Sequence, residues 1–208
     1  MTDLVVLVPD RNIEYAIRGI LGRRESLGIR EITAEVHPHP AHDPGCFANS
    51  PEFLLFAVKK AEHALVVFDH HGSGQDHTMD RVAMEDDVEK RLSAQGWQGR
   101  CSAIAIAPEL ENWVWSASPH VDAVLGWEGR RPPLRAWLQK QGHWAEKDEK
   151  PAHPKEAMLA AIRVAGKSRS SKLFADLAGR VGFTQCTDEA FVKLRQVLRS
   201  WFGRQREF

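Results

Sequence analysis

The sequence predicts an α/β protein with an open, mostly parallel sheet of about four strands, followed by a helical C-terminal region. Before residue 126, short apolar runs alternate with longer segments of helical periodicity, which is typical of parallel sheets with crossover helices. From Pro154 onward only helical periodicity remains. We therefore expect an α/β domain over 1–126, a connector over 127–153, and a helical region over 154–208 with its own small apolar cluster.

The strands are predicted from continuous or alternating apolar runs. Residues 4–8 and 64–68 are apolar without interruption and rich in Val, which is typical of strands buried on both faces of a parallel sheet. Residues 102–107 form another buried run, and we expect these three strands to be central. Residues 31–37 alternate between polar and apolar side chains, which predicts a half-exposed outer strand. A final short strand is expected over 121–125.

The helices are predicted from apolar spacing and cap residues. Asn12 is suited to cap the first helix, and Gly28 to close it. Ser50 and Pro51 are a typical helix start, as N-cap and first helical residue. The stretch 37–45 before them is broken by Pro and Gly and is interpreted as a loop. The expected helices cover 13–27, 51–63, 79–94, 134–139, 155–165, 171–181 and 188–202, with a short helix after Pro108.

The composition argues against several functional classes. The chain of 208 residues has 28 basic and 28 acidic side chains, and this balance argues against non-specific nucleic-acid binding. Cys46, Cys101 and Cys186 are far apart, which excludes a disulfide scaffold and a zinc ribbon. No apolar run approaches the roughly 20 residues that span a membrane, and no leader-like segment opens the chain. We expect a cytoplasmic protein without a membrane partner.

Acidic side chains follow three of the four main predicted strands. Asp10 follows the first strand, Asp69 the third and Glu111 the fourth, and Glu14 lies one turn into the first helix. The carboxyl ends of parallel strands meet at one edge, where ligands bind in open α/β sheets. Converging carboxylates repel one another unless a cation lies between them, and hard oxygen ligands suit Mg²⁺ or Mn²⁺. The sequence therefore predicts a divalent metal site at this edge.

The order of these residues resembles the TOPRIM fold, a Rossmann-like sheet. The chain is similar in particular to small stand-alone TOPRIM-like proteins found among bacterial anti-phage defence genes. In those relatives the first motif reads roughly Val-Glu-Gly-x-Thr-Glu and the second reads Asp-x-Asp. The likeness is carried by Val8-Pro9-Asp10-Arg11-Asn12-Ile13-Glu14, Asp69-His70-His71-Gly72, Pro108-Glu109-Leu110-Glu111-Asn112-Trp113, Pro154-Lys155-Glu156 and the spacing from Cys186 to Phe191.

The resemblance implies a metal-dependent phosphodiesterase or nuclease in defence against foreign DNA, with nucleic acid and other defence-system proteins as partners. Asp69, Glu111 and Asp10 would be metal ligands, and Glu14 or His71 would be the base or a further ligand. The implied cofactor is a divalent metal, Mg²⁺ or Mn²⁺.

The sequence departs from the family pattern at two points. The first glutamate is replaced by Pro9, or by Asp10 with a shift of one residue, and the second aspartate of Asp-x-Asp is His71. Because imidazole is a poor ligand for Mg²⁺ and a better one for Mn²⁺, Zn²⁺ or Fe, either the metal has changed or catalysis has been lost. The alternative function is a catalytically degraded TOPRIM-like accessory or regulatory subunit of a multi-protein defence system.

Two further groups have both a functional and a structural interpretation. His37, His39 and His42 with Asp43 resemble a metal-binding tract, but the prolines between them favour an extended loop. Cys46 has the chemistry of a thiol nucleophile, but nothing visible in the sequence fixes its geometry.

The basic side chains of the C-terminal region form another such group. Basic residues outnumber acidic ones in 151–208, whereas the reverse holds in 1–150. Lys167, Arg169 and Lys172 lie among serines, where they are suited to contact phosphates. A solvated loop between two helices is the alternative interpretation.

Overall fold

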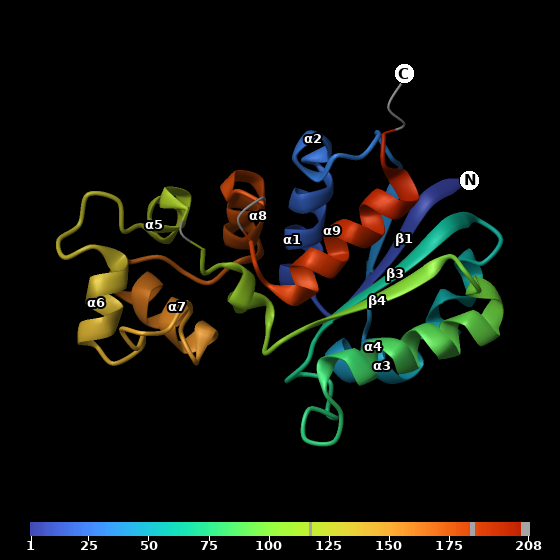
Figure 1. Ribbon diagram of the computed structural model, residues 1–208, viewed down its shortest axis with the longest axis horizontal. Coiled ribbons are helices and arrows are strands. Elements are labelled where there is room, and N and C mark those ends of the chain that lie inside the picture. The colour runs from blue at the N-terminus through green and yellow to red at the C-terminus, as the bar shows by residue number, and fades with distance from the viewer. Residues whose placement is uncertain (117, 184–185, 205–208) are drawn as a thin grey trace.

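The computed structural model describes residues 1–116, 118–183 and 186–204. It confirms the predicted class: an α/β fold with a four-stranded, all-parallel sheet of order β2-β1-β3-β4 and a helical C-terminal region (Figure 1). The strands are β1 (Thr2–Val8), β2 (Ala34–Pro38), β3 (Ala61–Asp69) and β4 (Cys101–Ile106). β2 is an outer strand, as its alternating pattern predicts.

Helices connect the strands and continue beyond the sheet. The α-helices are α1 (Arg11–Leu21), α2 (Arg24–Leu27), α3 (His42–Phe53), α4 (Arg81–Leu92), α5 (Pro119–Leu125), α6 (Leu134–Lys140), α7 (Pro154–Val164), α8 (Ser171–Arg180) and α9 (Glu189–Phe202). Three short helical turns are η1 (Leu54–Ala57), η2 (Ser93–Trp97) and η3 (Leu110–Trp113). Across the described ranges, none of these helices combines the length and the apolar character required to cross a bilayer.

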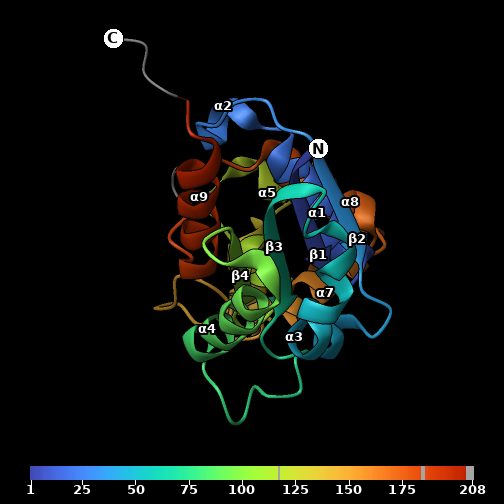
Figure 2. The ribbon, with the colours of Figure 1, turned by 90° about the vertical axis from the view of Figure 1, so that its right-hand side faces the viewer.

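Helices cover both faces of the sheet. Successive side chains of a strand point to opposite faces, so they belong to two different buried clusters. Val6 of β1 and Leu65 of β3 belong to the cluster beneath α1, α8 and α9. Val5 and Val66 belong to the cluster beneath α3 and α4. Figure 2 shows these two groups of helices on opposite sides of the strands.

The C-terminal helices do not form an apolar cluster of their own, contrary to expectation. Phe174 of α8 and Leu198 of α9 belong to the same buried cluster as Leu65 of β3. The C-terminal region therefore helps to cover the sheet. The division of the chain at residues 126 and 154 stays a prediction.

The helix between β2 and β3 starts earlier than predicted. It begins at His42, inside the stretch interpreted as a loop, and it contains Pro51. Pro44 is tolerated because N–H groups of a first turn have no helical partner. Pro51 deprives the Phe47 carbonyl of its helical hydrogen bond, and Arg91 of α4 donates to that carbonyl instead at 2.5 Å. The contact from Arg91 thus compensates for Pro51 inside the helix, although the local sequence around Pro51 indicates a helix start.

Two strand expectations are wrong. The segment 121–125 is helix α5, which Ser118 caps, Pro119 opens and Gly126 closes with φ +78°. These cap signals outweigh the strand preference of its valines. The strand 102–107, observed as β4, lies at the edge of the sheet and not in its centre. A buried apolar run does not distinguish a central strand from an edge strand that helices cover.

Side chains of α4 close the outer edge of β4. The N–H of Ala103 donates to Glu89 and the N–H of Ala105 donates to Glu85, each at 2.9 Å. Lys193 of α9 contacts these carboxylates, at 2.8 Å from Glu89 and 3.1 Å from Glu85. These contacts satisfy N–H groups that an edge strand otherwise leaves unpaired.

Candidate functional site

Asp69 ends β3 and lies at the carboxyl edge of the sheet, where its position after the buried run places it. Its backbone N–H donates to Asp43 Oδ1 at 2.8 Å. Part of the residue reaches the surface, but its own Oδ1 atom is buried and has no hydrogen-bond partner among the described residues. Such an oxygen is unfavourable unless the carboxyl group is protonated or a cation binds it.

The pKa of Asp69 reflects this environment. Burial, and then the charges of Asp43, Glu111 and Glu109, raise the pKa of Asp69 well above its ordinary value of 3.8. The backbone amide of Leu110 acts in the opposite direction but does not compensate. Asp43 contacts Asp69 directly through the 2.8 Å hydrogen bond from the Asp69 N–H, and the charges of Glu109 and Glu111 act on the Asp69 carboxyl group in the same direction.

Asp43 also belongs to this group. It is not predicted as one of the acids at strand ends, because it follows no central strand. It is the second residue of α3. Burial raises its pKa above the ordinary value; the backbone N–H of Asp69 lowers it, and the charge of Asp10 raises it further. The available signal was an acid and a proline in succession, which is typical of a first helical turn.

Glu111 lies in η3, which is separated from the end of β4 by three residues, and its side chain is only 1% exposed. Arg169, from the loop between α7 and α8, donates to Glu111 Oε1 from Nε at 2.9 Å, and its Nη2 lies 2.8 Å from the same oxygen. The other oxygen, Oε2, is buried and has no hydrogen-bond partner within the described ranges. One carboxylate oxygen of Glu111 is therefore paired with a cation, and the other lacks a hydrogen-bond partner among the described residues.

A second cation lies beside this pair. Lys155, near the start of α7, contacts Glu109 Oε2 at 3.1 Å. Burial alone would lower the pKa of Lys155, but its hydrogen bond with Glu109 and the charges of Glu109 and Glu111 raise it, while Arg169 acts against them. We refer to Asp43, Asp69, Glu109, Glu111, Lys155 and Arg169 as the edge cluster.

Asp10 and Glu14, both predicted site residues, have local structural roles. Asp10 caps α1 by accepting two backbone N–H groups of its first turn at 2.8 and 3.0 Å. Its charge contributes to the raised pKa of Asp43, so Asp10 borders the edge cluster. Glu14 pairs with Arg18, one turn along α1, at 3.0 Å. The structure thus places both carboxylates near the predicted edge but gives each another partner.

His71 lies on the turn after Asp69, and its side chain is exposed. Its backbone N–H donates to the Pro108 carbonyl at 3.0 Å, which joins this turn to the segment before η3. The neighbouring His70 ring places Nε2 at 2.9 Å from the Met79 carbonyl. The role of His71 as a ligand or base stays a prediction.

The candidate ligand side chains fit a metal site with one or two protein ligands better than a site in which the protein supplies every ligand. Within 1–116, 118–183 and 186–204, no three His, Cys, Asp or Glu side chains are grouped as metal ligands. Asp10, Asp69, His71 and Glu111 therefore do not form one such group. Mg²⁺, however, keeps several waters and commonly takes one or two carboxylates together with substrate phosphate. The unpartnered oxygens of Asp69 and Glu111 fit that smaller requirement.

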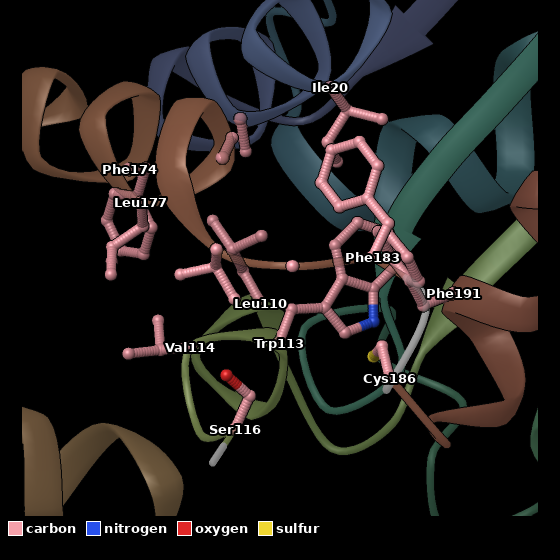
Figure 3. A pocket seen from close by; sticks show the side chains of 14 residues that line it. Ile20, Leu110, Trp113, Val114, Ser116, Phe174, Leu177, Phe183, Cys186 and Phe191 are labelled. Atoms are coloured by element: carbon pink, nitrogen blue, oxygen red, sulfur yellow. The ribbon is translucent and has the colours of Figure 1, made fainter. Parts of the chain in front are cut away.

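An apolar pocket lies between α1, η3, α8 and α9. Some of its lining residues are chain neighbours of edge-cluster residues, but the pocket is apolar whereas the edge cluster is charged. Figure 3 shows Leu110, Trp113, Phe174 and Phe191 among its lining side chains. Its volume is about 50 Å³, far below the roughly 300 Å³ of the smallest common ligand sites. We interpret it as a packing gap and not as a nucleotide site.

His39 and Cys46 have structural roles. His39 is buried, and its Nδ1 atom accepts the backbone N–H of Ala41 at 3.0 Å. Gly45 provides the room, because a Cβ atom there would lie 2.0 Å from His39 Nδ1. Burial, and then the charge of Asp43, raise the pKa of the Cys46 thiol, so the thiolate that a nucleophile needs is disfavoured.

The parallel sheet with acidic side chains at its carboxyl edge defines an open-sheet α/β protein with a candidate site in the usual position. No family model, curated protein or solved structure matches the chain.

Proposed function

We propose that this chain is a metal-dependent TOPRIM-like phosphodiesterase or nuclease that acts in the cytoplasm as a component of a bacterial defence system. The observation that carries the proposal is the pair of buried carboxylate oxygens without described partners, Asp69 Oδ1 and Glu111 Oε2. Both belong to segments that resemble TOPRIM motifs, and this resemblance supplies the reaction class and the nucleic-acid substrate.

Asp69 and Glu111 would hold the divalent ion, Mg²⁺ or Mn²⁺. When bound, such an ion polarises a phosphodiester and lowers the pKa of a water molecule. Asp43 positions Asp69 by accepting its backbone N–H at 2.8 Å. His71 is exposed on the next turn, and we assign it the role of base or further ligand. Glu14 is less suited to that role because Arg18 holds its carboxylate.

An accessory binding subunit is the second candidate. It is favoured by the two ion pairs at the edge, because Arg169 and Lys155 already neutralise Glu111 and Glu109 without a metal. Asp10, at the position of the family's first acidic residue, is used as a helix cap. In this case the edge cluster would stabilise the fold or bind a partner, and no cleavage would occur.

Assays of cleavage and metal binding separate the two candidates. Wild type, Asp69→Asn and Glu111→Gln are incubated with single-stranded and duplex DNA and RNA in Mg²⁺ and then Mn²⁺, and metal affinity is measured by calorimetry. We expect both variants to lose most metal affinity and cleavage, because each removes a charge and keeps the shape of the side chain. If His71 is a ligand, Mn²⁺ should support more activity than Mg²⁺.

Asp86→Asn and Glu146→Gln are matched controls, because both residues are exposed and lie outside the edge cluster. They should behave as wild type. Absence of cleavage and of metal binding in the wild-type protein would defeat the enzyme and support the accessory subunit.

A further inference from the structure

Two cations of the C-terminal region reach the carboxyl edge of the sheet. Lys155 is the second residue of α7, a helix that packs against η3 (Figure 1). Arg169 directly precedes Ser170, the N-cap of α8. The helical region therefore delivers both side chains from separate segments to the same acidic end of the sheet.

Each cation is held by a carboxylate that lies deeper than itself. The Arg169 side chain is 31% exposed over a Glu111 side chain that is 1% exposed. The Lys155 side chain is 43% exposed over a Glu109 side chain that is 14% exposed. The carboxylates thus form the floor of the site, and the cations face solvent.

The ion pairs leave donors for a second anion. Glu111 contacts the Nε and Nη2 groups of Arg169, both through Oε1. A guanidinium has five N–H donors and an ammonium has three, so one carboxylate oxygen cannot use them all. The buried carboxylates also restrict the two side chains, which reduces the conformational entropy that ligand binding would otherwise remove.

The two cations meet neighbouring positions of the chain, because their partners Glu109 and Glu111 are two residues apart. Arg169 acts to lower the pKa of Lys155, against the effect of the two glutamates. An anion placed between two positive groups relieves their repulsion, and phosphate is the anion for which Arg and Lys are the usual contacts. By contrast, Lys172 of α8 is 83% exposed, and its nearest acidic partner, Asp176, is 4.0 Å away and 40% exposed.

We propose that Arg169 and Lys155 form a phosphate-binding pair at the carboxyl edge of the sheet, and that their ligand is the phosphate backbone of a nucleic-acid strand. The choice of a nucleic acid rests on the proposed function, whereas the pair itself rests on the geometry. Phosphate contacts carry no sequence information, so DNA and RNA strands of equal length bind alike at this pair.

The test measures binding without catalysis. A fluorescently labelled single-stranded DNA oligonucleotide and its RNA counterpart are titrated with the protein in EDTA, and anisotropy is followed at several salt concentrations. Arg169→Gln and Lys155→Gln should each weaken binding of both strands about tenfold and reduce the salt slope by about one. Inorganic phosphate in excess should compete with the strand. Lys172→Gln is the matched control and should bind as wild type.

Arg169→Gln leaves Glu111 without its cation, so a loss of binding by misfolding must be separated from a loss of contact. The double variant Arg169→Gln/Glu111→Gln restores charge balance and should fold, yet it should still bind more weakly than wild type, because the Arg169 donors are absent. Arg169→Lys keeps the charge and should retain most of the affinity. Circular dichroism and thermal melting report folding for each variant.

The result that overturns the inference is equal binding by wild type, Lys155→Gln and the double variant, or absence of strand binding by wild type. Asp69→Asn distinguishes this inference from the proposed function. It removes a negative charge, so it should leave strand binding in EDTA unchanged or tighter while it abolishes metal-dependent cleavage. Weak binding by Arg169→Gln together with full cleavage by Asp69→Asn would support the phosphate pair and defeat the metal site at Asp69.

Discussion

The Asp43 carboxylate lies directly against Gly72, where a Cβ atom would come within 2.6 Å of Asp43 Oδ2. At the same time, Asp43 Oδ1 accepts the backbone N–H of Asp69 at 2.8 Å. One side chain from α3 therefore contacts both ends of the turn that follows β3. The absence of a side chain at Gly72 is what makes this contact sterically allowed.

The first prediction concerns this contact. Gly72→Ala should destabilise the protein by about 1–3 kcal/mol, because the added methyl group must displace Asp43 or the turn. The free energy of unfolding is measured by chemical denaturation. Gly179→Ala is the control: among the described residues, a Cβ atom there has no neighbour within 4 Å, so in helix α8 it should be stabilising by about 0.5–1 kcal/mol. Equal stability of Gly72→Ala and wild type would contradict the steric argument.

A second prediction follows from the raised pKa of Asp69. Below the ordinary value of 3.8, Asp69 is protonated in both the folded and the unfolded state, and its stabilising contribution is complete. As the pH rises through the raised pKa of the folded state, that contribution is lost. Asp69→Asn stays neutral, so its melting temperature should exceed that of wild type by a margin that widens as the pH rises from the ordinary value of 3.8 toward the raised pKa of Asp69.

Thermal melts across this pH range provide the measurement. Asp86→Asn, an exposed control on α4, should follow the wild-type curve at every pH. A constant offset between Asp69→Asn and wild type would show that the pKa of Asp69 is not raised in the folded protein.

The third prediction is an asymmetry within the Arg169–Glu111 pair. Arg169→Gln should cost about 3 kcal/mol, because it leaves the buried Glu111 carboxylate without a cation. Glu111→Gln should cost only about 1 kcal/mol, because Arg169 is 31% exposed and its guanidinium can be hydrated by water. Denaturation of both single variants and the double variant gives the coupling energy. The reverse order of the two single variants would refute the assigned burial.

The fourth prediction concerns the closed edge of β4. Glu85 is 2% exposed, accepts the Ala105 N–H and pairs with Arg81 and Lys193. Glu85→Ala should destabilise the protein by about 3 kcal/mol and promote association, because it opens an edge strand and leaves two cations without this partner. Glu85→Gln, which can still accept the N–H, should associate less. Denaturation and light scattering test this, and a monomeric Glu85→Ala protein of wild-type stability would oppose it.

Several elements could be predicted because their signals are local. The uninterrupted run 64–68 requires burial on both faces, so a central parallel strand is the structure that satisfies it. The apolar spacing of α8 and α9 predicts both helices to within about one residue, and the structure shows that Ser170 and Asp188 cap them. Asp69 and Glu111 were found by the rule that ligand sites lie at the carboxyl ends of parallel strands.

Other elements depend on distant parts of the chain. The start of α3 is not evident from the sequence, because Pro51 locally indicates a helix start, whereas Arg91 of α4 donates to the Phe47 carbonyl that Pro51 leaves without its helical partner. The earlier helix start is what places Asp43 in the candidate site. Asp10 is expected as a ligand, and the structure shows that it caps α1; its role as a ligand stays a prediction. Both roles suit an aspartate after a strand, and the sequence alone does not distinguish them.

The sequence by itself determined the fold class, the two inner strands and the presence of acids at one edge, because hydrophobic periodicity is a local property and the alternation of strands with helices favours parallel pairing. Only the tertiary structure decided which charges neutralise which. Arg169 and Lys155 are far in sequence from Glu111 and Glu109, and their pairing depends on how α7 and α8 pack against η3 and α1. Packing geometry decides which charges pair in this way, because electrostatic attraction depends on the distance between two charges in space and not on their separation along the chain.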